Sequence, residues 1–298
     1  MGRIVRVITK DASVVCSAID GTDIAARIEE INHSSKVCTA ALGRLALGAS
    51  LMGFGLKNRD DTLTVRIDGD GPIGTMIAVS DSCGNVKAYM SHTDVEIAPK
   101  YPGKLDVGGA VGRDGTITVI KDMGLKEPYS GQIPLVSGEI AEDITQYLAE
   151  SEQTPGACAL GVLLKPDCTV KCAGGFLLQV LPFAPEEVIS RIEENMKSIT
   201  SVTDLLENGM TAEELAKLPL AGLESDVLDD FEVNYVCDCS RERTERMLIS
   251  LGKDDLEDLA RDEVTEVKCN FCDKVYRFTS GEIKSLIKES SANEDSAE

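Results

Sequence analysis

The chain has 298 residues, of which 43% are apolar, and its 30 basic and 51 acidic residues give a net charge of −21. This length is enough for about two domains with buried cores. So large an excess of acid disfavours nucleic acid as a partner, because phosphate backbones are bound by concentrated basic surface. The N-terminus lacks the order of a signal peptide, and the most apolar helical stretch, AALGRLALGASLMGFGL, is too short to span a bilayer. We therefore expect a cytoplasmic protein with no membrane partner, in which the ten cysteines are mostly reduced thiols.

The first part of the chain predicts an α+β fold, with a mixed α/β core and a mostly antiparallel sheet. Six runs have strand patterns and are separated by turn sequences such as DGDGP and DSCGN; they are RIVRVIT, ASVVCSAI, TLTVRID, IGTMIAV, NVKAYM and TITVIKDM. Tight turns of this kind connect antiparallel neighbours. The core is expected to cover residues 1–181 and to close with a hairpin that turns at Pro166 and Asp167.

Two helices are expected within this core. The first runs from about residue 33 to residue 57. The second lies in SGEIAEDITQYLAES, where four apolar residues recur at helical spacing: Ile140, Ile144, Tyr147 and Leu148.

The glycines of DGDGPIG match a dinucleotide-binding fingerprint, with Gly69, Gly71 and Gly74 in G-x-G-x-x-G. That fingerprint requires a helix directly after it, so that the N-terminus of the helix can hold a pyrophosphate. The residues that follow have a strand pattern instead, and Pro72 lies inside the motif. We therefore predict a hairpin turn here.

The composition changes after the core. Pro185 suits the first position of a helix with an apolar stripe, and Thr211 with Glu214 forms a capping box. Residues 186–232 contain 13 Asp and Glu residues but only three basic residues. Short helices that repel themselves in this way need another surface to stay folded. The sequence thus predicts a metastable helical linker over residues 182–230.

Four cysteines lie in two tight pairs near the C-terminus. Cys237 and Cys239 form C-x-C, and after 29 intervening residues Cys269 and Cys272 form C-x-x-C. This spacing is typical of a tetrahedral thiolate site with zinc as the metal, because each tight turn directs two sulfurs at one point. We expect a small domain over residues 231–298, with the strand-like flanks FEVNYV and KVYRFT as its scaffold and a disordered acidic tail, SSANEDSAE.

The other six cysteines lie singly in apolar or strand patterns, apart from two on the closing hairpin. We interpret them as small buried hydrophobic residues. They are Cys16, Cys38, Cys83, Cys158, Cys168 and Cys172.

Spacing alone leaves open whether the four-cysteine site is a static structural site or a redox-active one. In extended chain the Cα atoms of Cys237 and Cys239 are roughly 6–7 Å apart, at the edge of disulfide geometry, so their sulfurs join only if the backbone bends. Zinc holds two sulfurs about 3.8 Å apart, whereas a disulfide requires about 2.05 Å. Oxidation and zinc binding therefore exclude each other, which is what a switch requires.

Several blocks of the sequence resemble the redox-regulated holdase chaperones of the 33 kDa heat-shock protein family. HSSKVCTAALGRLALGASLM resembles the first long helix of that family, LTVRIDGDGPIG its glycine-rich hairpin, and SGEIAEDITQYLAESEQTP its helix ending in SEQ. The C-x-C and C-x-x-C pairs resemble its C-terminal redox centre. The resemblance covers nearly the whole chain, and the six additional cysteines depart from the family pattern.

This resemblance implies an ATP-independent chaperone, not an enzyme, that is inactive while reduced and zinc-bound. Carried over by position, Cys237, Cys239, Cys269 and Cys272 are both the ligands of one zinc ion and the redox sensors. The resemblance further implies disulfides that join Cys237 to Cys239 and Cys269 to Cys272. Oxidation is then expected to release zinc, unfold the linker, form a homodimer and expose a surface that binds unfolding client proteins.

Two other functions remain open. A constitutive zinc-ribbon adaptor would bind protein or nucleic acid in either redox state. A disulfide oxidoreductase would use Cys269 and Cys272 as its reactive pair, although no thioredoxin-like βαβ pattern surrounds them. An aggregation assay with reduced and oxidised protein separates these functions from a redox-regulated chaperone.

Overall fold

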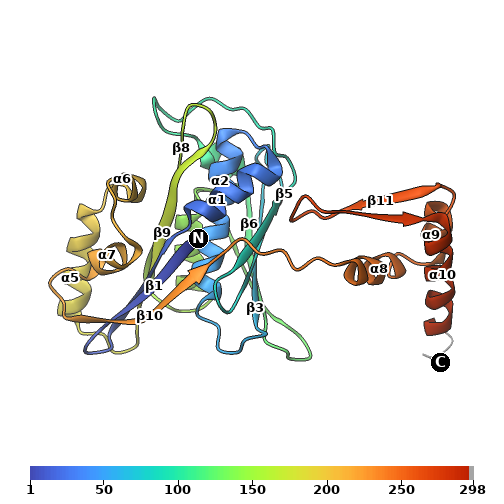
Figure 1. Cartoon of the computed structure of the whole chain (residues 1–298). Helices are drawn as coiled ribbons and strands as arrows, with labels where there is room; N and C mark the ends of the chain where they lie inside the picture. The colour runs from blue at the N-terminus through green and yellow to red at the C-terminus, as the bar shows by residue number, and fades with distance from the viewer. Residues whose placement is uncertain (295–298) are drawn as a thin grey trace. The chain divides into compact units, whose positions relative to one another are not determined.

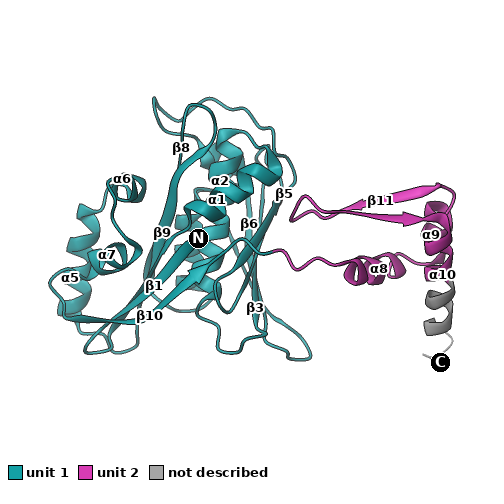
Figure 2. Ribbon diagram, in the orientation of Figure 1, with its two compact units in different colours: residues 1–236 teal, residues 237–298 magenta. Residues whose placement is uncertain are grey.

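The computed structural model describes the backbone of residues 1–294 and the side chains of residues 1–287. The chain divides into two compact units, Met1–Val236 and Cys237–Glu298 (Figure 2). Every ladder between named strands is antiparallel, and helices form the other regular elements. The predicted α+β class is therefore confirmed. The tail that we expect to be disordered comprises residues 290–298. Residues 290–294 instead form the end of helix α10 (Ser280–Glu294), and residues 295–298 lie outside the described residues.

The first sheet of unit 1 brings together the two ends of that unit, in the strand order β10-β1-β2-β9-β8 (Figure 1). Its strands are β1 (Gly2–Thr9), β2 (Val14–Asp20), β8 (Gly156–Leu164), β9 (Val170–Val180) and β10 (Ser225–Val233). Side chains alternate between its faces and both faces are buried, since Ile4 belongs to one apolar cluster and its neighbour Val5 to another. The hairpin of β8 and β9 turns at Pro166 and Asp167, as predicted.

The second sheet of unit 1 has the order β5-β4-β3-β6-β7. Its strands are β3 (Thr62–Gly69), β4 (Met76–Asp81), β5 (Val86–Met90), β6 (Gly115–Asp122) and β7 (Tyr129–Pro134). All six predicted strand runs are strands in the structure. The edge strand β7 is not among them, because a glycine and a proline interrupt its short pattern.

The glycine motif forms the hairpin between β3 and β4, as predicted. At Gly71, a Cβ atom would lie 2.4 Å from the Ala110 carbonyl oxygen and 2.5 Å from the Gly112 nitrogen. The glycine is required by this close approach of two backbone segments. The motif therefore serves packing, and the dinucleotide interpretation is excluded by the strand that follows.

Helix α2 (Lys36–Gly53) contacts strands of both sheets and is buried along nearly its whole length. It is shorter than the predicted helix over residues 33–57: it begins after Ser35 and ends at Gly53, where a Cβ atom would lie 2.4 Å from Ser80 Oγ. Two further helices, α1 (Thr22–Asn32) and α3 (Val107–Val111), are not among the predicted ones. Among the described residues, no helix is both long and apolar enough to cross a membrane.

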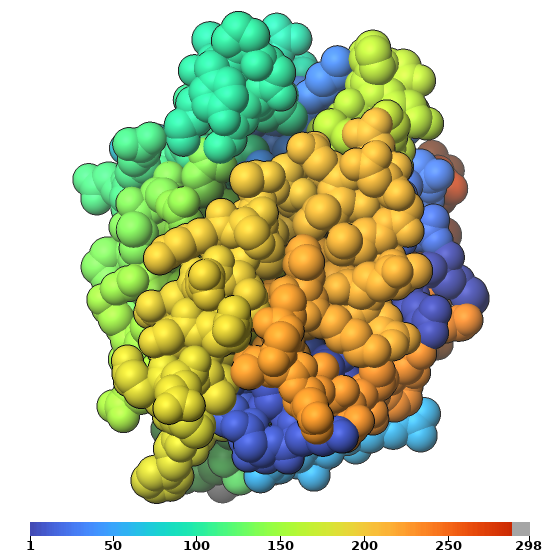
Figure 3. Space-filling view, turned by 90° about the vertical axis from the view of Figure 1, so that its left-hand side faces the viewer, coloured from blue at the N-terminus to red at the C-terminus, as the bar shows by residue number. Residues whose placement is uncertain are grey.

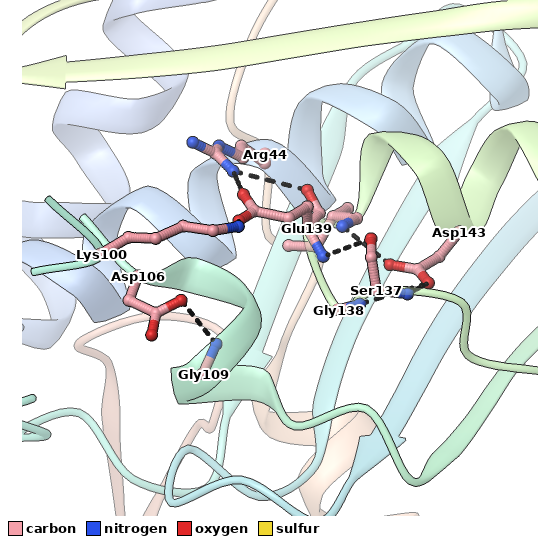
Figure 4. A network of polar contacts seen from close by, with 9 residues as sticks. Arg44, Lys100, Asp106, Gly109, Ser137, Gly138, Glu139 and Asp143 are labelled. Atoms are coloured by element: carbon pink, nitrogen blue, oxygen red, sulfur yellow. Dashed lines mark hydrogen bonds and ion pairs between the residues drawn. The ribbon is translucent and has the colours of Figure 1, made fainter. Parts of the chain in front are cut away.

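Helix α4 (Ala141–Glu150) carries three residues of the predicted apolar stripe, Ile144, Tyr147 and Leu148, and Ile140 directly precedes the helix. All four residues are buried. The fully buried Asp143 accepts hydrogen bonds from the backbone N–H groups of the loop before the helix: Val136, Ser137, Gly138 and Ile140. Figure 4 shows Asp143 beside Ser137 and Gly138 of this loop. Ile140 has φ 75°, an unfavourable value for a β-branched residue. The four donors compensate the buried carboxylate and hold this strained turn in place.

The same loop is tied to α2 by Glu139, which lies between two cations (Figure 4). Its carboxylate is 2.8 Å from Arg44 Nη1 and 3.0 Å from Lys100 Nζ. Burial raises the pKa of Glu139, but the hydrogen bonds from Lys100 and Arg44 outweigh it and lower the pKa below its ordinary value. The network therefore fixes the loop before α4 against the central helix.

The predicted linker folds onto the outer face of the first sheet (Figure 3). It consists of α5 (Glu186–Ser198), α6 (Val202–Glu207), α7 (Ala212–Lys217) and a 3-10 turn (Leu218–Leu220). Ile192 and Leu215 are buried in one apolar cluster with Val5, Val7 and Phe176 of the sheet. The predicted capping box is present, since Thr211 Oγ1 accepts from Glu214 N–H and Glu214 Oε2 accepts from Thr211 N–H. The linker helices thus cover a sheet face that would otherwise be exposed and apolar.

Strand β10 begins inside the range predicted for the helical linker, residues 182–230, so the last residues of that range form a strand of the first sheet. It is paired with β1, not with a strand beside the cysteines. The expectation that FEVNYV scaffolds the cysteine site is therefore wrong. Two ion pairs across the strands stabilise this pairing. Arg3 pairs with Asp230, and Arg6 lies 3.3 Å from Asp229. Residues 234–236 then run beside β5, where Val236 N–H donates to the Val86 carbonyl over 3.0 Å.

Candidate metal centre

Unit 2 is a small scaffold whose described apolar core is limited. Its elements are α8 (Arg241–Ile249), α9 (Lys253–Leu259), β11 (Val264–Lys268), β12 (Val275–Thr279) and α10 (Ser280–Glu294). The buried cluster consists of Leu248, Leu256, Ala260, Phe278, Ile283 and Leu286. A core of this size contributes little to the free energy of unfolding without a further constraint.

The four clustered cysteines come together at one point. Cys237 and Cys239 lie on the extended segment before α8, and Cys269 and Cys272 lie in the turn between β11 and β12. All four Sγ atoms are within 4.8 Å of one another. The distance is 3.7 Å from Cys237 Sγ to Cys269 Sγ and 3.4 Å from Cys239 Sγ to Cys272 Sγ. The two halves of the motif therefore meet sulfur to sulfur, as one shared ligand set requires.

Local hydrogen bonds hold both halves. In the first half, Ser240 Oγ accepts from Arg243 N–H over 3.2 Å, which caps α8 directly after Cys239, and Arg243 forms an ion pair with Asp238. In the second half, Cys269 N–H donates to the Lys274 carbonyl over 3.0 Å and closes the turn. The sulfurs are thus positioned by a helix cap on one side and by a hairpin turn on the other.

Arg241 connects three elements of unit 2 around this site. Its guanidinium lies 4.3 Å from the ring centroid of Phe278 on β12. It also donates to the Arg277 carbonyl over 2.9 Å and to Glu282 of α10 over 2.6 Å. The start of α8, where the first cysteine pair ends, is thereby joined to β12 and α10.

The thiols differ in how readily they ionise. Burial raises the pKa of Cys239, but hydrogen bonds from the Tyr276 hydroxyl and from neighbouring thiols outweigh it and lower that pKa to about 7. Burial raises the pKa of both Cys237 and Cys272. These hydrogen bonds therefore favour the thiolate of Cys239, whereas thiolates at Cys237 and Cys272 require a cation to balance their charge.

Tyr276 is a site residue that sequence reasoning missed. Its hydroxyl donates to Cys239 Sγ over 3.2 Å, and this bond raises the pKa of the phenol to about 12. The signal in the sequence was a tyrosine four residues after Cys272 within the expected strand KVYRFT. Strand alternation alone does not specify that its hydroxyl reaches a sulfur of the other cysteine pair.

The geometry and donor set of the four cysteines fit one tetrahedral metal ion. An ion about 2.3 Å from each of four sulfurs separates those sulfurs by about 3.8 Å, close to the 3.4 Å and 3.7 Å contacts observed. Four thiolates are soft ligands and select metals of the zinc or iron–sulfur type. The arrangement therefore forms a candidate metal centre within unit 2.

The other six cysteines lie in unit 1, and three of them agree with the interpretation as buried residues. Cys16, Cys38 and Cys172 are buried, and Cys158 and Cys168 are half-buried. Cys83 is exposed, so the interpretation is wrong for this residue; it lies in the turn between β4 and β5, where the side chain points away from the core. Burial raises the pKa of Cys158 to about 12, which leaves this thiol protonated and unreactive.

Comparison with known proteins gives consistent similarities. The model of the family described as Hsp33 protein matches residues 2–279. The 33 kDa chaperonin of Clostridioides difficile (strain 630) is 48% identical over 260 residues, which are 87% of this chain and 89% of that protein. The 33 kDa chaperonin of Lachnoclostridium phytofermentans is 45% identical over 288 residues, 96% of this chain and 98% of that protein.

A solved structure is similar over the same extent. The crystal structure of the 33 kDa chaperonin from Thermotoga maritima matches with a TM-score of 0.90 and 34% sequence identity. The match covers 97% of this chain and 99% of that chain. The similarity therefore includes both units and the linker between the core and the cysteines.

Proposed function

Because the chain belongs to the Hsp33 family, a family of chaperones and not of enzymes, we propose that it is a redox-regulated, ATP-independent holdase of the cytoplasm. In this proposal the reduced protein is inactive and binds one zinc ion. Oxidation releases the ion and exposes a surface that holds unfolding proteins. The observation that carries the proposal is the convergence of four cysteine sulfurs within 4.8 Å of one another in a unit with a small core.

Zinc is the proposed metal, with Cys237, Cys239, Cys269 and Cys272 as its ligands. Zinc prefers tetrahedral thiolate sites, and when bound it supplies the positive charge that stabilises four thiolates at neutral pH. We further propose that oxidation joins Cys237 to Cys239 and Cys269 to Cys272. A disulfide requires sulfurs about 2.05 Å apart, so neither pair can form it and keep the spacing of a zinc ligand set.

The proposed client surface lies under the linker. The face of β1, β2 and β9 beneath α5 to α7 is apolar, and the helices that cover it are short and acidic. Short helices depend on packing for most of their stability. Little helix stability would be lost on release of the linker, because these helices have little stability of their own. Release would uncover a large apolar surface, and such surfaces bind unfolded chains.

We expect the reduced protein to contain one zinc ion per chain and to lose it when peroxide is added during mild heating. The reason is the geometric exclusion between zinc binding and the disulfides. Elemental analysis measures the zinc content of the reduced protein, and a colorimetric zinc chelator measures the zinc released on oxidation. Cys83→Ser is the matched control, since it removes an exposed thiol of unit 1 and is expected to leave zinc release unchanged. A reduced protein without metal, or one that retains zinc after all four thiols are oxidised, contradicts the proposal.

Activation is also expected to produce a homodimer. A newly exposed apolar face favours self-association when no client is present. Light scattering on the oxidised protein should show a mass that rises toward twice the monomer mass with concentration, while the reduced protein stays constant over the same range. An active species that remains a monomer at every concentration would show that dimerisation is not part of the switch.

A further inference from the structure

Strand β5 lies at one edge of the second sheet, where β4 is its neighbour on the inner side. Hydrogen-bonded residue pairs alternate along an antiparallel ladder, so every second residue of β5 directs its backbone N–H and C=O away from β4. Val86 and Ala88 are two such residues, because the partners of these backbone groups lie in residues 234–236 and not on β4. An edge of this kind is a template on which another chain can add a strand.

A short segment of the chain already occupies this edge in the manner of an added strand. Val86 N–H donates to the Asn234 carbonyl and the Val86 carbonyl accepts from Val236 N–H, both over 3.0 Å, in the pattern of a parallel ladder. At the next outward position, the Tyr235 hydroxyl donates to the Ala88 carbonyl over 3.0 Å and accepts from Ala88 N–H over 3.2 Å. One side chain therefore takes the place of a backbone unit of an added strand.

The edge also provides an apolar contact for one large side chain. The Tyr235 ring packs against the main apolar cluster of unit 1, to which Val86 and Ala88 both belong. Strand addition takes its affinity from main-chain hydrogen bonds and its selectivity from the contacts of alternate side chains. The edge of β5 therefore fits an extended polypeptide segment with an aromatic residue where Tyr235 lies.

The segment that covers the edge is continuous with the candidate metal ligands, since Cys237 follows Val236 directly. In the proposed function, oxidation removes the metal from Cys237 and unfolds unit 2. Residues 234–236 then lose the anchor at one of their ends. So short a stretch at the end of an ordered region opens at low free-energy cost, and its release leaves the outward backbone groups of Val86 and Ala88 unpaired.

We infer that the edge of β5 is a second client-binding surface, which residues 234–236 cover in the reduced protein and which takes an extended segment of an unfolding protein after oxidation. The inference rests on the proposed function and adds the edge of the second sheet to the apolar face beneath the linker. Unfolding proteins supply extended segments whose backbone groups are unpaired, and the edge supplies the complementary donors and acceptors. Main-chain recognition of this kind accepts many sequences, as a holdase requires.

The test follows amide hydrogen exchange at single residues of β5 in the full-length protein by NMR. The samples are the reduced protein, the oxidised protein, and the oxidised protein with reduced and carboxymethylated α-lactalbumin, a permanently unfolded probe. We expect the Val86 and Ala88 amides to be protected in the first sample, to exchange about tenfold faster or more in the second, and to be protected again in the third. The Lys87 and Tyr89 amides are the internal control, because they face β4 and should stay protected throughout.

The variant Tyr235→Phe separates the covering segment from the surface beneath it, because it keeps the ring and removes only the hydroxyl. In the reduced variant, the Ala88 amide should exchange about fivefold faster than in the wild type, the change that loss of one ordinary hydrogen bond produces. With the probe bound to the oxidised variant, protection of the same amide should equal that of the wild type. Tyr101→Phe, at an exposed tyrosine of unit 1, is expected to match the wild type in every sample.

Three results would overturn the inference. In the first, the Val86 and Ala88 amides exchange fast while the probe is held, which places clients elsewhere. In the second, both amides stay protected in oxidised monomer without the probe, so the covering segment is not released. In the third, protection returns with rising protein concentration and not with the probe, which assigns the edge to a second copy of this chain.

Failure of the proposed function looks different from these results. A reduced protein that holds no zinc, or an oxidised protein that does not hold the probe, contradicts the proposed function itself. A protein that releases zinc and holds the probe while the Val86 and Ala88 amides exchange fast contradicts only the inference about β5.

Discussion

Replacement of Leu215 by glutamate is expected to give a chaperone that is active while still reduced and metal-bound. Leu215 is fully buried in α7, within the apolar cluster that joins the linker to β1 and β2. Loss of a buried leucine side chain costs about 2–5 kcal/mol, and an ionised carboxylate in the same apolar contact adds a further penalty. The linker helices have little stability of their own, so we expect them to detach as a group.

The measurement is light scattering from a thermally unfolding client mixed with reduced Leu215→Glu protein. The reduced variant should suppress aggregation as strongly as the oxidised wild type, and the reduced wild type should not. Ser190→Glu is the control, because it adds the same carboxylate to an exposed position of α5 and is expected to remain inactive until oxidised. If limited proteolysis shows that the linker of Leu215→Glu is released but aggregation continues, the surface beneath the linker is not where clients bind.

Much of unit 1 could be predicted because its signals are local. The six strand runs have clear alternation or apolar character, and tight turns separate them. The stripe of α4, with Ile144 and Tyr147, follows helical spacing, and both residues are buried where that spacing places them. The sequence of the linker likewise predicted that its helices pack on another part of the protein, since an apolar stripe on a short acidic helix requires a partner surface.

The elements that were missed depend on distant contacts. α1 begins after Gly21, which offers no capping side chain, so the sequence signal for its start is weak. β10 has the pattern of a strand, but the choice of β1 as its partner is made across more than 200 residues, where Arg3 meets Asp230. Local propensity contains no information about such a pairing.

The candidate metal centre also combines a feature that local sequence predicts with one that depends on distant contacts. The spacing of the four cysteines predicted that they come together, because two tight turns suffice to direct two pairs of sulfurs. The hydroxyl of Tyr276 on Cys239 was not foreseen, since it depends on how β12 packs in a small core. The convergence of the four cysteines could thus be predicted from local sequence, whereas the side chains that contact them are set by tertiary packing.

Oxidation is expected to unfold unit 2 first and the linker afterwards. Structural zinc in small peptides contributes roughly 10–16 kcal/mol of apparent binding free energy, while the whole stability of a domain is commonly about 5–15 kcal/mol. Unit 2 has a limited core, so loss of its metal should unfold it outright. The chain connects Cys237 to the linker through residues 234–236 and the edge strand β10, whose Leu228 and Phe231 side chains are exposed. Such an edge opens at low free-energy cost, and we propose that the linker detaches with it.

Hydrogen exchange of the oxidised, client-holding protein tests this account most directly. Amides of residues 186–232 should exchange slowly in the reduced protein and fast after oxidation, because α5 to α7 lose the sheet surface that supports them and β10 loses its pairing with β1. Amides of residues 140–148 should stay protected in both states, because α4 is buried in the core and fixed by Asp143. Slow exchange throughout residues 186–232 in an oxidised protein that holds clients would contradict the account.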